Sequence, residues 1–77
     1  MDLLQMSLGG RVLVKLRQRR ELTGRLVAYD DHLNIMLSDA KETVTSAESQ
    51  VVTKRDLQIV YVRGDLVIMV APQQTAF

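Results

Sequence analysis

The chain has 77 residues, of which 47% are hydrophobic, and its 10 lysines and arginines against 9 aspartates and glutamates give a formal charge of +1. A domain this small buries only about 60% of its unfolded surface, so we expect other chains to cover part of its apolar surface. The balanced charge argues against a polybasic protein that binds nucleic acid through phosphates alone. The absence of cysteine excludes disulfides and thiolate metal sites.

The sequence gives no sign of a membrane or secretory segment. No apolar run approaches the roughly 20 residues that are needed to cross a bilayer. Residues 1–10 lack the basic segment and the small-residue cleavage site of a signal peptide. We therefore expect an intracellular protein.

Residues 2–10 predict a short helix. Asp2 can accept a hydrogen bond from the first turn, and Gly9 or Gly10 can take the left-handed position after the last turn. Leu4 and Leu8 would share one face. Because so short a helix is unstable alone in water, it should lie on the open end of a sheet.

Alternating residues predict the first two strands and a bend. Residues 11–17 alternate with Val12, Val14 and Leu16 inward, which is typical of a half-buried strand. Residues 18–20 form a basic hairpin loop. Residues 21–30 form the second strand, in which Gly24 marks a bend or a close backbone approach. The expected inward residues of this strand are Leu22, Gly24, Leu26 and Ala28.

The third strand is predicted to begin at Leu33, with Leu33, Ile35 and Leu37 inward. After Asp39 the inward residues become Ala40, Glu42 and Val44, so we expect a bulge near Ser38 and Asp39. The strand continues to Thr45, and residues 46–50 form a polar loop.

The last third of the chain holds two continuous apolar runs, 57–62 and 66–70, separated only by Arg63, Gly64 and Asp65. Runs of this kind are typical of strands covered on both faces. A tight turn should join them, with Gly64 free to take a positive φ. Since the chain is too small to cover both strands, a neighbouring subunit should pair along their edges. Pro72 should end the sheet, with a loose tail after it.

The only histidine, His32, lies in the polar turn between the second and third strands. Simpler residues would suffice for a turn, so this turn is a candidate site, and residues 63–65 are a second one. Catalysis has little support, because His32 has no cysteine or paired acid as a partner. A metal site at Asp30, Asp31 and His32 is also not expected, since three adjacent turn residues rarely converge on one ion.

These motifs resemble the Sm-like (Lsm) family. The first family motif corresponds to residues 12–39, with Gly24, Asp30, Leu33, Asn34 and Leu37 at its signature places. The second corresponds to residues 57–70, with Arg63, Gly64 and Asp65 as its core. Within the family the chain most resembles the third member of the eukaryotic Lsm set. The short loop at residues 47–50 and the pair Gly9 and Gly10 depart from that member. A compact version from a reduced genome and an archaeal relative stay alternatives.

The resemblance implies a single Sm-like domain over residues 1–77. Its fold class is mainly β: a short N-terminal helix followed by a strongly bent, five-stranded antiparallel barrel of SH3-like form. The fourth strand of one subunit would pair with the fifth strand of the next, closing a ring of six or seven. A mixed ring of seven is expected, and a homo-oligomer in isolation stays open. No cofactor is implied.

The resemblance also implies that the ring binds single-stranded, uridine-rich RNA near its pore. Such rings act in pre-mRNA splicing, at the 3′ end of a spliceosomal small nuclear RNA, and in mRNA decay, so the expected location is nucleus and cytoplasm. The alternative is a protein-interaction scaffold subunit with little RNA contact of its own. A monomeric SH3-like domain ranks last, because its pocket would need more aromatic residues.

The site residues follow from the motif positions. His32 would stack on a base, and Asn34 would read a uracil edge through its amide. Arg63 would pack on the other face of the base, and Gly64 would permit close backbone approach. Asp30 and Asp65 would support the site by fixing the turns. The roles of Arg17, Arg19 and Arg20 stay open between a solvated loop and an RNA guide, and Tyr29 and Tyr61 are expected to pack.

Overall fold

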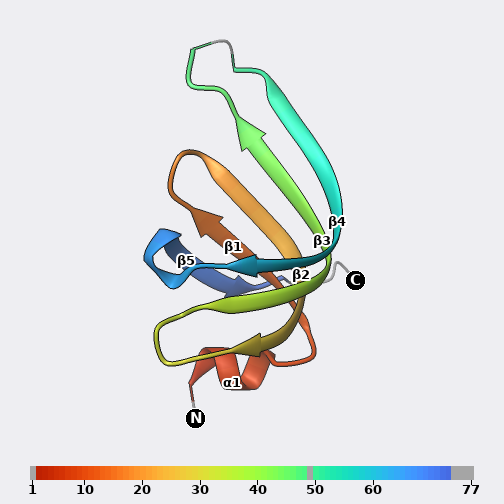
Figure 1. Cartoon of the computed structure of the whole chain (residues 1–77), viewed down its shortest axis with the longest axis vertical. Helices are drawn as coiled ribbons and strands as arrows, with labels where there is room; N and C mark the ends of the chain where they lie inside the picture. Colours follow the sequence, from red (N-terminus) through yellow and green to blue (C-terminus); the bar gives the residue numbers. More distant parts are fainter. Residues whose placement is uncertain (1, 49, 74–77) are drawn as a thin grey trace.

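The computed structural model describes residues 2–48 and 50–73, which form one short helix and five strands (Figure 1). This agrees with the predicted mainly β fold with an N-terminal helix. None of the helices in the described part of the chain has the length and apolar character needed to cross a membrane. The elements in chain order are α1 (Leu3–Ser7), β1 (Arg11–Leu16), β2 (Arg20–Tyr29), β3 (Ile35–Thr45), β4 (Val52–Val62), the 3-10 turn η1 (Gly64–Leu66) and β5 (Val67–Pro72).

Helix α1 begins and ends as the sequence predicts. The Asp2 carboxylate accepts a hydrogen bond from the Gln5 amide at 2.8 Å, and Gly9 after the helix takes φ +85°, which only glycine adopts without steric cost. Leu4 packs against the core. The expected shared face with Leu8 is wrong, because the helix ends at Ser7 and Leu8 has an extended backbone that leaves it exposed.

The five strands form one antiparallel sheet in the order β4-β3-β2-β1-β5. The sheet curves strongly, so that β4 bends over the other strands while α1 lies across the lower end (Figure 1). It is not a closed barrel, because β4 and β5 are the two edges and do not pair with each other within the chain. Each edge therefore has a row of backbone amides and carbonyls that the chain itself does not pair.

The curvature arises where β2 pairs with β3 around Gly24. A Cβ atom on Gly24 would lie 3.0 Å from the carbonyl oxygen of Ser38 and 3.2 Å from the Cα of Ala40, so a larger residue would push the backbone of β3 away. The pairing register shifts between Thr23 and Arg25, across Gly24, and Asp39 opposite takes φ +48°. The predicted bend at Gly24 and the predicted bulge at Ser38 and Asp39 are thus one feature.

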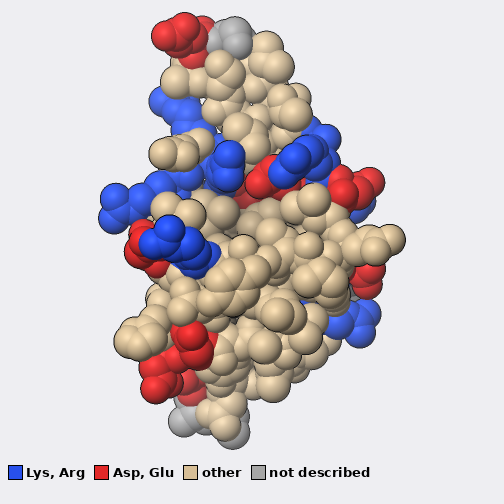
Figure 2. All heavy atoms as spheres, in the orientation of Figure 1, with Lys and Arg blue, Asp and Glu red and all other residues tan. Residues whose placement is uncertain are grey.

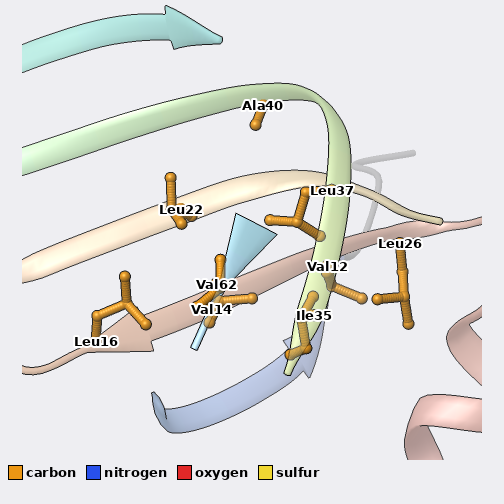
Figure 3. Close-up of a cluster of buried hydrophobic side chains, with 9 residues drawn as sticks. All are labelled: Val12, Val14, Leu16, Leu22, Leu26, Ile35, Leu37, Ala40 and Val62. Carbon is orange, nitrogen blue, oxygen red and sulfur yellow. The ribbon is translucent and has the colours of Figure 1, made fainter. Parts of the chain in front are cut away.

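The core lies inside this curve and is made of nine apolar side chains (Figure 3). Three residues expected to face inward are absent from it: Val44, which is only half-buried, Ala28 and Leu33. Ala28 is exposed, because a second register shift after Leu26 reverses the alternation and brings Tyr29 against the core instead. Leu33 is 39% exposed, because it lies in the turn with φ +63°, and β3 begins only at Ile35. The core residues are Val12, Val14, Leu16, Leu22, Leu26, Ile35, Leu37, Ala40 and Val62.

The two apolar edge strands are exposed within the chain. Ile59 and Tyr61 on β4 are 60% and 61% exposed, and Ile68 on β5 is 65% exposed. Single exposed apolar residues are ordinary, but rows of them along both free edges of one sheet mark an interaction surface. The chain therefore covers only one face of the two apolar runs and leaves the other face exposed.

Two expectations about the end of the chain need correction. The connection between β4 and β5 is the short 3-10 turn η1, and it carries the chain from one edge of the sheet to the other instead of closing a hairpin. Gly64 does not take the expected positive φ, which Gly9 alone takes among the described glycines. Pro72 ends β5 as predicted. Residues 74–77 of the expected loose tail lie outside the described residues.

Replacing Leu26 with alanine should lower the free energy of unfolding by about 2–5 kcal/mol, because Leu26 is fully buried and its loss leaves a cavity. Urea denaturation at fixed protein concentration measures this change. Val27→Ala on the same strand is the matched control, since Val27 is 45% exposed and should change stability far less. Equal losses for both variants would contradict the core assignment.

Candidate nucleic-acid interface

The turn between β2 and β3 is built around the carboxylate of Asp30. One oxygen, Oδ1, accepts hydrogen bonds from the backbone amides of His32 at 2.9 Å and Asn34 at 3.0 Å. The Asp30 carbonyl accepts a further bond from the Leu33 amide at 3.1 Å. An aspartate that bonds the amides following it holds a tight turn, and the left-handed Leu33 completes the reversal. The side chain of His32 is left exposed at the tip.

The amide of Asn34 connects this turn to η1. Its Nδ2 donates to the second oxygen of Asp30 at 2.9 Å, and its Oδ1 accepts from the backbone amide of Gly64 at 2.8 Å. Asn34 and Gly64 are 30 residues apart in the chain. Since an asparagine amide has two N–H donors and an oxygen with two lone pairs, one donor and one lone pair remain for another partner.

Gly64 is required for the close approach of the two turns. A Cβ atom there would overlap the backbone carbonyl of His32 and come within 2.9 Å of the carbonyl carbon of Leu33. Any other residue would therefore push η1 away from the β2–β3 turn. Because Gly64 has no side chain, the backbones that carry His32 and Arg63 can come into contact.

Arg63 and Asp65 flank Gly64 and pair with each other. Arg63 Nη2 lies 2.8 Å from Asp65 Oδ2, and the side chains are 70% and 61% exposed. An exposed ion pair of this kind contributes little to stability, but it restricts where the guanidinium points. All six predicted site residues thus lie in two contacting turns: Asp30, His32, Asn34, Arg63, Gly64 and Asp65.

The hydrogen bond from the Asn34 side chain lowers the pKa of Asp30, and the amides of Asn34 and His32 act in the same direction. The carboxylate is therefore charged throughout the neutral range. Its negative charge lies behind the turn, where it accepts three hydrogen bonds.

One element of this region was not predicted from the sequence. The backbone amide of Arg17, in the β1–β2 turn, donates to the carbonyl of Leu66 at 3.0 Å. The turn η1 therefore lies between the basic β1–β2 turn and the β2–β3 turn, and the three connections follow one another along one side of the molecule (Figure 1). No sequence signal predicts this contact, because it depends on the curvature of the whole sheet.

A sequence model described as the LSM domain matches residues 2–72. The chain belongs to the LSM family. The Sm-like protein LSM3B of Arabidopsis thaliana is 46% identical over 94% of this chain and 82% of its own length. The probable U6 snRNA-associated Sm-like protein LSm3 of Dictyostelium discoideum is 45% identical over the same shares. These relatives confirm the resemblance to the third eukaryotic Lsm member.

Solved LSM-family structures agree with the fold. The Pyrococcus abyssi Sm protein in complex with a uridine heptamer superposes with a TM-score of 0.77, at 35% identity over 94% of each chain. A heptameric archaeal Sm protein gives a TM-score of 0.75 at 39% identity, over 92% of this chain and 96% of that one. The Sm fold predicted from the motifs is confirmed.

The Asp30 turn should make the stability of the protein depend on pH. Because folding lowers the pKa of Asp30, its contribution is fully present above the ordinary aspartate pKa and is lost as the pH falls through the lowered value. Asp30→Asn should therefore be less stable than the parent at pH 7, with a difference that shrinks in acid. Urea denaturation between pH 7 and about pH 3 measures both proteins.

The control is Asp31→Asn, which removes the same charge from the neighbouring exposed residue. It should leave the pH dependence of the parent nearly unchanged. A constant difference between Asp30→Asn and the parent over the whole pH range would contradict the role given to the carboxylate.

Proposed function

We propose that this chain is an RNA-binding subunit of an Sm-like ring and holds single-stranded, uridine-rich RNA near the pore. The observation that carries the proposal is the hydrogen bond from Gly64 N–H to Asn34 Oδ1, at 2.8 Å. It joins two turns that are distant in the sequence and places His32 and Arg63 on contacting backbones. A structural turn needs neither an exposed imidazole nor an exposed guanidinium.

The chemistry of the paired turns fits a nucleobase. The imidazole of His32 and the planar guanidinium of Arg63 both present flat faces that stack on bases. Asn34 keeps one donor and one lone pair after its structural bonds, enough to contact the edge of a uracil. Gly64 removes the side chain that would separate the two turns.

The open edges of the sheet fit assembly. Strands β4 and β5 lie at opposite ends of the sheet order, so β4 of one subunit can pair with β5 of the next and extend one sheet around a ring. The related archaeal protein is named as a heptamer, and the Pyrococcus abyssi protein as a complex with a uridine heptamer. One weak site per subunit then acts many times on one RNA.

The cellular role that we propose follows the named relatives. The Dictyostelium discoideum relative carries a U6 snRNA-associated name, which favours pre-mRNA splicing, with mRNA decay as the related role. We propose a mixed ring with other Sm-like subunits, in nucleus and cytoplasm. The role is binding and not catalysis.

Replacing Arg63 with alanine should weaken binding of the assembled protein to a uridine oligomer, and His32→Ala should weaken it by about 1–3 kcal/mol per stacked base. Fluorescence anisotropy with labelled oligo-uridine measures the affinity. Arg25→Ala is the matched control, since Arg25 is exposed on β2 away from the two turns. Asn34→Ala would be less clean, because it also breaks the bond to Gly64.

The oligomer of each variant should stay intact, so a loss of affinity would be local to the site. If His32→Ala and Arg63→Ala both bound uridine like the parent, the site assignment would fail. Intact rings without uridine affinity in the parent itself would instead favour the protein-interaction scaffold.

Replacing Ile59 with aspartate should break the oligomer, because it puts a charge into the apolar edge that the neighbour would cover. Native mass spectrometry of the chain, alone and with other Sm-like subunits, measures the assembly. Val27→Asp is the control, since Val27 is exposed but lies on the inner strand β2. A parent protein that stays monomeric under all these conditions would overturn the ring.

A further inference from the structure

A hollow of about 330 Å³ lies at the end of the β1–β2 hairpin, and its lining combines three cations with Glu21 and the apolar side chains of Leu16 and Ile68. Three cations surround it, Lys15, Arg19 and Arg20, and Thr43 and Thr45 of β3 add two hydroxyl groups. At about 30 Å³ per water molecule, the space exceeds what one small ion requires. Figure 2 shows lysine and arginine side chains gathered at the level of this hairpin.

The cations of the hairpin are only partly neutralised. Lys15 lies 4.0 Å from Glu21, and Arg20 lies 4.0 Å from Glu42. Glu42 is already held at 3.0 Å by Arg55, so it does not balance Arg20 fully. Within residues 2–48 and 50–73, no carboxylate lies at ion-pair distance from Arg17 or Arg19. The turn therefore carries an excess of positive charge.

The backbone conformation of the β1–β2 turn does not favour arginine at position 19. Gln18 and Arg19 take φ +66° and +58°, which is the geometry of a two-residue hairpin turn that favours Asn-Gly. Larger residues adopt this conformation at a steric cost. A residue held in unfavourable geometry where a better former exists points to a function for its side chain.

The β1–β2 turn adjoins η1, which carries Gly64 of the base site. The Arg17 amide bonds the Leu66 carbonyl at 3.0 Å, and Gly64 at the other end of η1 bonds Asn34. The basic turn, η1 and the β2–β3 turn thus follow one another on one side of the molecule (Figure 1). A strand of RNA whose base lies between His32 and Arg63 has the basic turn beside it.

We propose that the basic β1–β2 turn, through Arg17 and Arg19, binds the phosphate backbone of the same single-stranded RNA, next to the base site. This inference rests on the proposed function, and it adds a contact that is independent of base identity. Guanidinium groups and hydroxyls suit phosphate oxygens. RNA is favoured over an acidic protein segment because the basic turn adjoins η1, which carries one half of the base site.

The test compares the double variant R17Q/R19Q with the parent, both as assembled protein, on oligo-uridine and oligo-adenosine at several salt concentrations. Each lost phosphate contact should lower the slope of log K against log salt by about 0.7. The double variant should therefore bind uridine severalfold more weakly at low salt, with a shallower slope. Its preference for uridine over adenosine should not change.

The matched control is R25Q/K41Q, which removes the same charge from exposed positions of β2 and β3. A double variant with the slope and affinity of this control would overturn the inference, and the hollow would then belong to another anionic partner. Failure of the proposed function would give a different result: the parent would show no preference for uridine, and Arg63→Ala would not change its RNA affinity. A parent that bound neither RNA would overturn both.

A second variant separates function from folding. Arg19→Gly removes the guanidinium but suits the left-handed backbone better, so its thermal midpoint should equal or exceed that of the parent while uridine affinity falls. An Arg19→Gly protein that binds uridine as the parent does would contradict the proposal.

Discussion

The hydrogen bond between Asn34 and Gly64 is the constraint on which the site depends, because it holds together two turns that the chain separates by 30 residues. It forms only if the sheet curves enough to bring η1 beside the β2–β3 turn. That curvature brings Gly24 so close to β3 that a Cβ atom there would lie 3.0 Å from the carbonyl oxygen of Ser38. Two glycines in different motifs thus act on one geometry: one lets β2 approach β3, and the other lets the turns meet.

The strand order explains why the chain is unfinished as a monomer. Strands β4 and β5 lie at opposite ends of the sheet and do not pair with each other, and their exposed apolar side chains find no cover within the described part of the chain. Assembly and binding meet at η1, because this turn joins the two edge strands and also carries Gly64 of the two-turn site. The open edges are the means by which copies of that site can be repeated.

Sequence patterns over short segments predicted the features that depend on neighbouring residues alone. Alternation gave the register of β1 and the inward face of β2 as far as Leu26, and the Asp2 cap and Gly9 predicted the helix ends. The errors lie where tertiary geometry overrides the local pattern. Ala28 and Leu33 were assigned to the core, but a register shift and a left-handed turn expose them. Gly64 was expected to need a positive φ, whereas it is needed for close approach to His32, a contact that no neighbouring residue in the sequence reveals.

The fold also distributes the charges of the chain unevenly. A formal charge of +1 suggests weak attraction to RNA, yet the charges are not spread evenly. Asp30 and Glu42 are both engaged in hydrogen bonds or ion pairs within the fold, while Arg63 and the arginines of the β1–β2 turn are exposed along one side. These two acids thus stabilise a turn and a strand, while these arginines are exposed to solvent. A nearly neutral chain can in this way offer a basic path to a phosphate backbone, and repetition around a ring would supply the affinity that the net charge of one subunit does not.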